Sequence, residues 1–348
     1  MKKRMLLLVV LVLAAVMLAG CGSKEKLKLF LPGAYHSDEV IRDFEKEFNC
    51  KVIIEEFDSN ESMYTKLLAG DKYDVLIPSD YTIERLIRED YLQKLDRETV
   101  VNLNLLADQV KNLDFDPTNE YSAPYFWGTV GIVYNKKNVD FADLEEQGFG
   151  IFANPKYDGH VYMYDSARDG FMIALKELGY SCNTEDESQI NEAYEWLLAM
   201  NKATHPVYVT DEVIDRMKAG DKDLAIVYSG DAADILSENE DMGYYTPMCG
   251  TNLWFDAMVI PKNAENAELA NKFINFMLDY EPCLMSSQEI GYASPNAKVL
   301  AEMSGEGGDY ADNEAYLPRV YEKDEIFHDN EKVRNKLNEL WTKVVATQ

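Results

Sequence analysis

Short apolar runs alternate with amphipathic stretches along most of this 348-residue chain. The runs are rich in β-branched residues or alternate with polar ones, as strands do, and the stretches between them place apolar residues three and four apart, as one face of a helix does. The pattern predicts strands at 27–31, 52–54, 73–78, 159–164, 224–228 and 253–260. It predicts helices at 38–48, 60–68, 79–89, 166–178, 186–201, 210–219, 267–278, 282–290 and 331–345, with another from about 230. This order is typical of α/β proteins, in which helices cover a mostly parallel sheet.

The strand–helix pattern occurs in two halves of the chain, whose length exceeds what one simple core usually serves. We therefore expect two lobes. The extended stretches 126–133 and 253–259 lie where the chain can cross between them, and the acidic stretch 305–312 is predicted to be a surface loop.

The amino terminus carries a different pattern. Three basic residues at 2–4 precede an apolar run at 5–18, and small residues then lead to Cys21. A charged start, an apolar core shorter than the roughly 20 residues of a membrane span and a small-residue end are typical of a secretory signal. The ending Leu-Ala-Gly-Cys is that of a bacterial lipoprotein. We expect 1–20 to be the signal, Cys21 to be acylated and 21–26 to be a tether, which places the mature chain outside the cell membrane on a lipid anchor.

The charge is strongly acidic: 34 Lys and Arg stand against 62 Asp and Glu, a net charge of −28. Loss of the three basic residues of the signal would take −28 to −31. Nucleic-acid binding needs clustered basic residues, so this class of partner is excluded. An acidic surface attracts cations instead, and it makes an anionic ligand less favourable.

Four cysteines remain beyond Cys21, at positions 50, 182, 249 and 283. They form no C-x-x-C pair and lie near no histidine at ligand spacing, so no zinc site, and no other metal or cofactor, is predicted. Disulfides are permitted outside the cell. All three two-bridge pairings, and a fully reduced chain, stay open.

Carboxylates and aromatic rings gather where the predicted strands end, which is where open α/β sheets bind ligands. Asp256 stands out because it interrupts an apolar strand, where a carboxylate is costly unless it is paired or hydrated. Aromatic faces add cation–π attraction. The set suits a small organic cation, although each member also has a helix-cap or core explanation. The strand-end candidates are Ser79, Asp80, Tyr81, Ser166, Asp169, Tyr228, Asp231, Trp254 and Asp256.

Several runs, weak singly and specific together, resemble the polyamine-binding proteins of ABC importers, the spermidine/putrescine-binding group. The resemblance covers nearly all of 27–348. Its strongest runs are 59–64 (SNESMY), 73–79 (YDVLIPS), 115–117 (FDP), 124–128 (PYFWG), 254–256 (WFD) and 291–296 (GYASPN).

The resemblance implies a type II periplasmic-binding-protein fold with the ligand between two lobes. By analogy, the first lobe takes 27–128 plus 256–300 and the second takes 129–255 plus 301–348. It also implies a monomer that delivers its solute to an ABC permease in the membrane.

The resemblance further implies pocket roles for individual residues. Asp256 would pair with a ligand ammonium while aromatic rings flank the methylene chain. Tyr228 stands where the family often has tryptophan. The remaining direct matches are Tyr35, Ser79, Tyr81, Trp254 and Tyr292.

This sequence departs from the family pattern at several pocket positions. The first loop reads Leu-Pro-Gly-Ala-Tyr at 31–35, without the usual aromatic wall and carboxylate. Ser166 replaces an aspartate, Asp169 shortens a glutamate, and His328 stands for a glutamine. Asp80 or Asp231 could restore the lost charge by position. The identity of the amine therefore stays open, and a shorter diamine or another cationic solute is an alternative.

Three other functions are alternatives. The pair Tyr244-Tyr245 suggests ferric-ion capture, but neighbouring residues of a strand face opposite ways. The G-x-S-x-G and H-E-x-x-H motifs are absent and the four histidines are scattered, so the chain is not expected to be an enzyme. A surface sensor that kept the fold without transport is the third.

Overall fold

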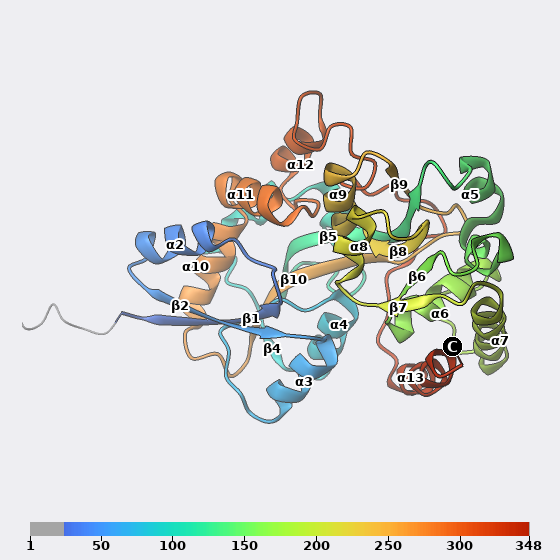
Figure 1. Ribbon diagram of the computed structural model, residues 1–348. Helices are drawn as coiled ribbons and strands as arrows, with labels where there is room; N and C mark the ends of the chain where they lie inside the picture. Colours follow the sequence, from blue (N-terminus) through green and yellow to red (C-terminus); the bar gives the residue numbers. More distant parts are fainter. Residues whose placement is uncertain (1–23, 348) are drawn as a thin grey trace, which may run out of the picture.

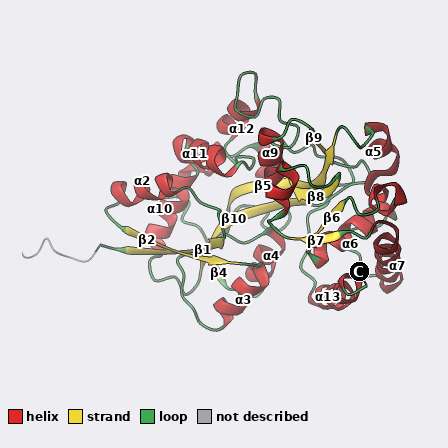
Figure 2. Ribbon diagram, viewed as in Figure 1, coloured by secondary structure: helices red, strands yellow, loops and turns green. Residues whose placement is uncertain are grey.

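The computed structural model describes residues 24–347 (Figure 1). The predicted signal at 1–20, Cys21 and the start of the tether lie outside the described residues. Two groups of helices and strands flank a central pair of long strands, and Figure 2 shows helices packed around the strands on both sides. The predicted two-lobed α/β architecture is confirmed.

One continuous path of paired strands runs through both lobes, in the order β2-β1-β3-β10-β5-β8-β6-β7, with β4 on β10 and β9 on β5. The strands are β1 Lys26–Pro32, β2 Lys51–Phe57, β3 Val75–Leu76, β4 Leu92–Gln93, β5 Ser122–Asn135, β6 Val161–Tyr164, β7 Val207–Val209, β8 Leu224–Tyr228, β9 Met242–Tyr245 and β10 Leu253–Pro261.

The two long strands β5 and β10 are antiparallel and join the lobes. The first half of β5 pairs with β10, and its second half pairs with β8 and β9. The extended stretches predicted at 126–133 and 253–259 lie in these two strands. Each lobe also has a parallel group, β2-β1-β3 or β8-β6-β7. The sheet is thus parallel at its two ends and antiparallel where the chain crosses, rather than mostly parallel throughout.

The helices begin where the sequence supplies caps. Ser37 accepts a hydrogen bond from the Val40 amide at the start of α2, and Ser59 forms a capping box with Ser62 at the start of α3. The α-helices are α2 Asp38–Glu47, α3 Asn60–Leu68, α4 Asp80–Arg88, α5 Phe141–Gln147, α6 Ala167–Glu177, α7 Glu187–Thr204, α8 Val213–Lys218, α9 Ser229–Glu238, α10 Ala267–Met277, α11 Tyr280–Ile290, α12 Ala297–Ser304 and α13 Glu331–Val345. Short 3-10 helices are η1 Val101–Leu105, η2 Asp108–Val110, η3 Gly148–Ala153 and η4 Pro155–Tyr157.

Most predicted elements are present, with the differences at short ones. The helix predicted at 210–219 is confined to α8, and the one at 282–290 begins earlier, as α11. The strands β7 and β9, too short for a clear alternation, were not predicted. The stretch 305–312 contains no helix or strand and none of its residues is buried, in agreement with the predicted surface loop.

The last helix, α13, packs on α6 and α7 of the second lobe (Figure 1). Gly170 permits this contact, because a β-carbon there would lie 2.1 Å from the Trp341 ring. The assignment of 301–348 to the second lobe, like the other lobe boundaries, stays a prediction.

The cysteines at positions 50, 182, 249 and 283 are free thiols. Of the alternatives that the sequence left open, the described residues therefore show the reduced chain, without a disulfide. Within 24–347, no helix is both long and apolar enough to cross a membrane.

Candidate ligand-binding site

Asp256 lies at an irregularity of the central strand pair. It is opposite Phe126, but the next residue, Ala257, is opposite Pro124, so the register shifts between them. Proline has no amide hydrogen to offer a sheet, which explains why it is tolerated at this point. The Ala257 amide bonds instead to the Pro78 carbonyl at 3.1 Å. The extra residue of this bulge is Tyr125 of β5, and the buried Asp256 lies on the facing strand at the same point.

The Tyr35 hydroxyl donates a hydrogen bond to Asp256 Oδ2 at 2.7 Å. Both side chains are largely buried, with exposed fractions of 7% and 9%. Tyr35 is held from behind, since the Tyr125 hydroxyl donates to its carbonyl at 3.0 Å. The altered first loop therefore still delivers one phenol to the carboxylate.

Ser79 and Asp80 follow β3 and begin α4. Ser79 lies beside Asp256 in an isolated bridge, and it is held by two hydrogen bonds with the Asn60 side chain. Asp80 instead accepts from the backbone amides of Tyr81 and Phe255, at 2.6 and 2.9 Å. Because each oxygen of Asp80 already has a donor, we interpret this carboxylate as structural, and it is a weak candidate for replacing the lost charge.

Asp169 lies in the first turn of α6, in the predicted second lobe. Its Oδ2 accepts a hydrogen bond from the Tyr228 hydroxyl at 2.8 Å, while its Oδ1 is buried and without a hydrogen-bond partner among the described residues. Ser166 caps α6 by accepting from the Asp169 amide at 3.4 Å. The serine thus orients the start of this helix.

Asp231 and Tyr292 join segments that are assigned by prediction to different lobes. The Tyr292 hydroxyl donates to Asp231 Oδ1 at 2.6 Å, from the segment after α11 to the first turn of α9. Gly230 allows this approach, because a β-carbon there would lie 2.1 Å from the Tyr292 ring. The segment itself is fixed to β5 by the Trp127 indole, which donates to the Ser294 carbonyl at 3.4 Å.

Trp254 lies between these carboxylates. Its ring meets Tyr292 edge-on at 5.2 Å and Tyr228 at 6.1 Å between centroids, and Tyr292 in turn meets Tyr35 at 5.8 Å. Its indole N–H is buried and unpaired within 24–347. We call the following set the acidic–aromatic array: Tyr35, Asp169, Tyr228, Asp231, Trp254, Asp256 and Tyr292.

Burial governs the charge of the array. It raises the pKa of Asp256 to about 6 and that of Asp231 to about 7, although tyrosine hydroxyls pull both values down. Burial also raises the pKa of Asp169. Among the described residues, no lysine or arginine forms an ion pair with any of the three. The array is therefore a group of buried carboxylates that lack a cation, which is suited to a ligand that supplies one.

Tyr81 and His328 lie beside the array. The Arg168 guanidinium stacks over the Tyr81 ring at 3.8 Å and donates to the His328 carbonyl at 3.4 Å. The His328 imidazole is half exposed and faces Glu84 at 3.3 Å. Of the twelve predicted residues, eleven thus lie in the array or beside it, whereas the His328 side chain is directed toward α4 and not toward the array.

The tyrosines proposed for ferric capture diverge. The Tyr244 hydroxyl lies 3.1 Å from Thr129 Oγ1 in the interior, whereas the Tyr245 ring packs on Phe141 at 5.6 Å. Their phenol groups therefore do not converge on one ion.

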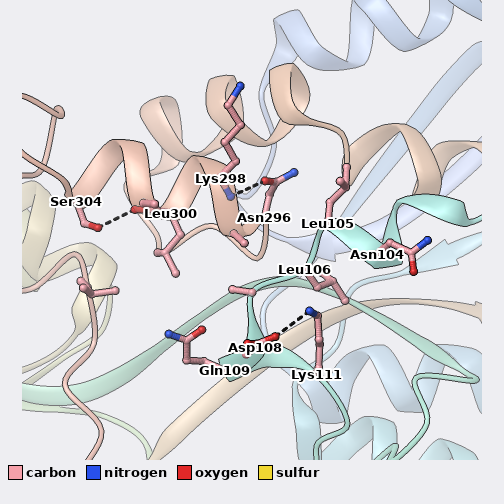
Figure 3. A pocket seen from close by; sticks show the side chains of 14 residues that line it. Asn104, Leu105, Leu106, Asp108, Gln109, Lys111, Asn296, Lys298, Leu300 and Ser304 are labelled. Carbon is pink, nitrogen blue, oxygen red and sulfur yellow. Dashed lines mark hydrogen bonds and ion pairs between the residues drawn. The ribbon is translucent and has the colours of Figure 1, made fainter.

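A groove of about 680 Å³ lies elsewhere, between α12 and the segment 104–111 (Figure 3). It contains none of the predicted ligand residues. Lys298 and Lys111 border it, and Lys111 pairs with Asp108 at 3.0 Å. The two basic residues make this groove a poor place for a cation.

The comparison with known families decides what kind of protein this is. A model of bacterial extracellular solute-binding proteins matches residues 39–318. The chain belongs to this family. Its members serve as solute-binding components of transport, and the predicted extracytoplasmic, periplasmic-binding-protein class is confirmed.

Individual relatives are similar along most of their length. The chain is 33% identical to the spermidine/putrescine-binding periplasmic protein of Salmonella typhimurium over 77% of this chain and 76% of that one. It is 32% identical to a putrescine/cadaverine-binding protein of Pseudomonas aeruginosa, over 96% and 98%. A solved structure described as a putative spermidine/putrescine ABC transporter from Listeria monocytogenes superposes with a TM-score of 0.84 at 35% identity, covering 93% of this chain and 100% of that one.

Two residues beside the array were not predicted. The Tyr164 ring packs on Tyr228 at 5.1 Å, and its hydroxyl donates to Asp211 Oδ1 at 2.9 Å. Tyr164 is the last residue of a predicted strand, so its position at a strand end could have identified it as a candidate. Asp211 follows β7, a strand of three residues that left no pattern.

Proposed function

We propose that this protein is an extracytoplasmic receptor that binds a polyamine of the spermidine/putrescine class and delivers it to an ABC permease. The observation that carries the proposal is the array of buried carboxylates, each given a tyrosine hydroxyl and none given a cation. The printed functions of the relatives agree with this chemistry.

Each tyrosine satisfies one oxygen and leaves lone pairs for the ligand. An ammonium group is a donor with three N–H bonds, so it suits a carboxylate whose other partners are neutral. The faces of Trp254 and Tyr292 then suit the methylene chain and add cation–π attraction of about 0.5–2 kcal/mol per contact. Low local dielectric strengthens the ion pairs once water is excluded.

Delivery requires that the ligand favour a closed form of the two lobes. The Tyr292–Asp231 hydrogen bond and the Arg168–Tyr81 stack each join groups from different predicted lobes. A cation shared by Asp256 and Asp169 would add a further link across the same boundary. Closure about the β5–β10 crossing then reports occupancy to the permease.

The test is isothermal titration calorimetry of the mature domain, made without Cys21, against putrescine, cadaverine and spermidine at physiological salt. We expect saturable one-to-one binding that survives added salt. Asp256→Asn should weaken binding by about 100-fold, because a buried charge-assisted contact contributes about 2–3 kcal/mol. Asp312→Asn, which removes the same charge from the exposed loop, is the matched control and should bind normally.

Two results would overturn the assignment. One is near-unchanged affinity of Asp256→Asn for every amine. The other is weak, multi-site binding that salt abolishes equally in all variants, since that would be non-specific attraction to the acidic surface.

The lipid anchor is a separate part of the proposal and is supported by residues 1–21 alone. Acylation at Cys21 would keep the receptor near its permease. Replacing Cys21 with serine in the full chain should move the protein from the membrane fraction to the soluble extracytoplasmic fraction. Mass spectrometry of the mature amino terminus would show whether two or more acyl chains are attached.

A further inference from the structure

The acidic–aromatic array continues beyond the residues described above. The ring contacts run from Tyr35 to Tyr292, Trp254 and Tyr228, and then to Tyr164 at 5.1 Å. Tyr164 donates its hydroxyl to Asp211, as the earlier tyrosines do to their own aspartates. The row of five rings therefore has a carboxylate at each end: Asp256 at the buried end and Asp211 at the exposed end.

Asp211 stands where a ligand group can reach it. It follows β7, next to the end of β6, and parallel strands of one sheet present their carboxyl ends at the same edge. Asp211 is exposed, whereas Tyr164, which lies between Asp211 and Tyr228, is half-buried. Asp211 and Tyr164 thus form the rim of the array.

Independent features of the neighbouring groups indicate that something is to be bound along this row. Asp169 is 4% exposed, and its Oδ1 has no hydrogen-bond partner within the described residues. The Trp254 indole N–H, also buried, is likewise unpaired there. Both residues contact Tyr228: Asp169 accepts a hydrogen bond from its hydroxyl, and the Trp254 ring lies 6.1 Å from its ring. The Tyr164 ring packs on the same Tyr228 ring. Buried polar groups are normally satisfied, so unpaired ones beside a row of rings point to a position that binds a ligand.

We propose that Asp211, positioned by Tyr164, binds the outer ammonium group of a long polyamine, so that this pair sets the chain length that the receptor prefers. This inference rests on the proposed function. A short diamine would use only the buried end and the middle of the row, while a triamine of spermidine length would extend to the rim. The pair would also supply a carboxylate that the first loop, at 31–35, lacks.

The experiment compares amines of increasing length on wild-type protein and on Asp211→Asn. The probes are putrescine, cadaverine, longer linear α,ω-diamines and spermidine, titrated by calorimetry. Asp211→Asn should lower the affinity for spermidine by about 10-fold, equivalent to about 1.4 kcal/mol, and change the affinity for putrescine by less than about twofold. Tyr164→Phe should act in the same direction with a smaller effect, because the carboxylate stays but loses its hydroxyl donor.

Asp215→Asn is the matched control. Asp215 is an exposed aspartate of α8, four residues from Asp211. Its substitution removes the same charge from nearly the same part of the chain. It should leave every affinity in the series unchanged. Circular dichroism of each variant checks that the fold is retained, and Asp211 is exposed enough for retention to be expected.

The outcomes separate this inference from the proposed function. If wild type binds putrescine and spermidine, and Asp211→Asn weakens both equally or neither, the length-setting role is wrong while the receptor assignment stands. If wild type prefers putrescine over every longer amine, the role is also wrong. If wild type binds no amine at all, the proposed function itself has failed, and this inference with it.

Discussion

Two buried aspartates of this protein are stabilised in opposite ways. The Asp329 side chain is 1% exposed and lies between two guanidinium groups, Arg88 of α4 at 2.7 Å and Arg334 of α13. Asp256 is 9% exposed and receives only neutral donors, chiefly the Tyr35 hydroxyl. One carboxylate has its cation built into the chain, while the other has none.

This difference separates structural carboxylates from those that we propose to bind the ligand. A buried ion pair with a fixed partner joins α4 to α13 whatever else is bound, and removing one member leaves uncompensated charge. A buried carboxylate without a cation lowers the stability of the ligand-free protein, and a cationic ligand would offset this cost. Asp80 is a third case, because backbone amides rather than a cation donate to its two oxygens, and burial raises its pKa to about 8.

The largest expected effect is on stability at the structural pair. Asp329→Asn should lower the free energy of unfolding by about 3 kcal/mol, because the mostly buried Arg334 loses its partner. Urea denaturation at pH 7 measures this. Asp90→Asn removes an exposed partner of Lys262 and should change stability by less than about 0.5 kcal/mol. Equal effects of the two substitutions would show that Asp329 is not specially placed.

For the corresponding substitution at Asp256, we expect the free energy of unfolding to change in the opposite direction. Its pKa of about 6 in the folded chain exceeds the ordinary value of 3.8, so ionisation at pH 8 costs stability. Asp256→Asn should therefore raise the ligand-free stability by about 1–2 kcal/mol while it weakens amine binding. A variant that is both less stable and fully able to bind would contradict the comparison.

A dependence on pH follows from Asp256 and Asp231. Their folded pKa values, about 6 and about 7, lie above the unfolded values, so the stability they contribute is complete below about pH 4 and is lost as pH rises through 6 to 7. Ligand affinity should change the other way, because only the ionised carboxylates pair with an ammonium. Thermal melts and calorimetry from pH 5 to 8 should show these opposite trends. The double variant Asp231→Asn, Asp256→Asn should reduce the first trend. The remainder comes from Asp80 and Asp169, whose pKa values burial also raises. An unchanged slope would refute the assignment.

The smallest effect is expected from a single hydroxyl. Tyr35→Phe leaves the Asp256 charge but removes its donor, so amine affinity should fall by about 5–10-fold, equivalent to about 1–1.4 kcal/mol. Tyr310→Phe, in a ring that stacks on Tyr316, is the matched control and should bind normally. If both variants bind alike, Tyr35 only fills space.

The amino-acid sequence by itself determined the class of fold and named most residues of the candidate site. Hydrophobic periodicity depends on neighbours a few residues apart, so it gave α10 and α13 almost to the residue. The same pattern identified Asp256 as a candidate, because a carboxylate inside an apolar strand is recognisable from the sequence before any contact is known. The family resemblance, now confirmed, supplied the aromatic positions.

Only the tertiary structure decided which carboxylates are free to bind. Asp80 and Asp231 are equivalent in the sequence, since each lies in the first turn of a helix that follows a strand. The fold gives Asp80 a second amide, from Phe255, 175 residues away, and gives Asp231 a phenol from Tyr292. The same applies to His328, which the fold turns toward Glu84, and to Asp211, which it joins to Tyr164. These partners are distant along the chain, and local pattern carries no information about contacts that only chain crossing creates.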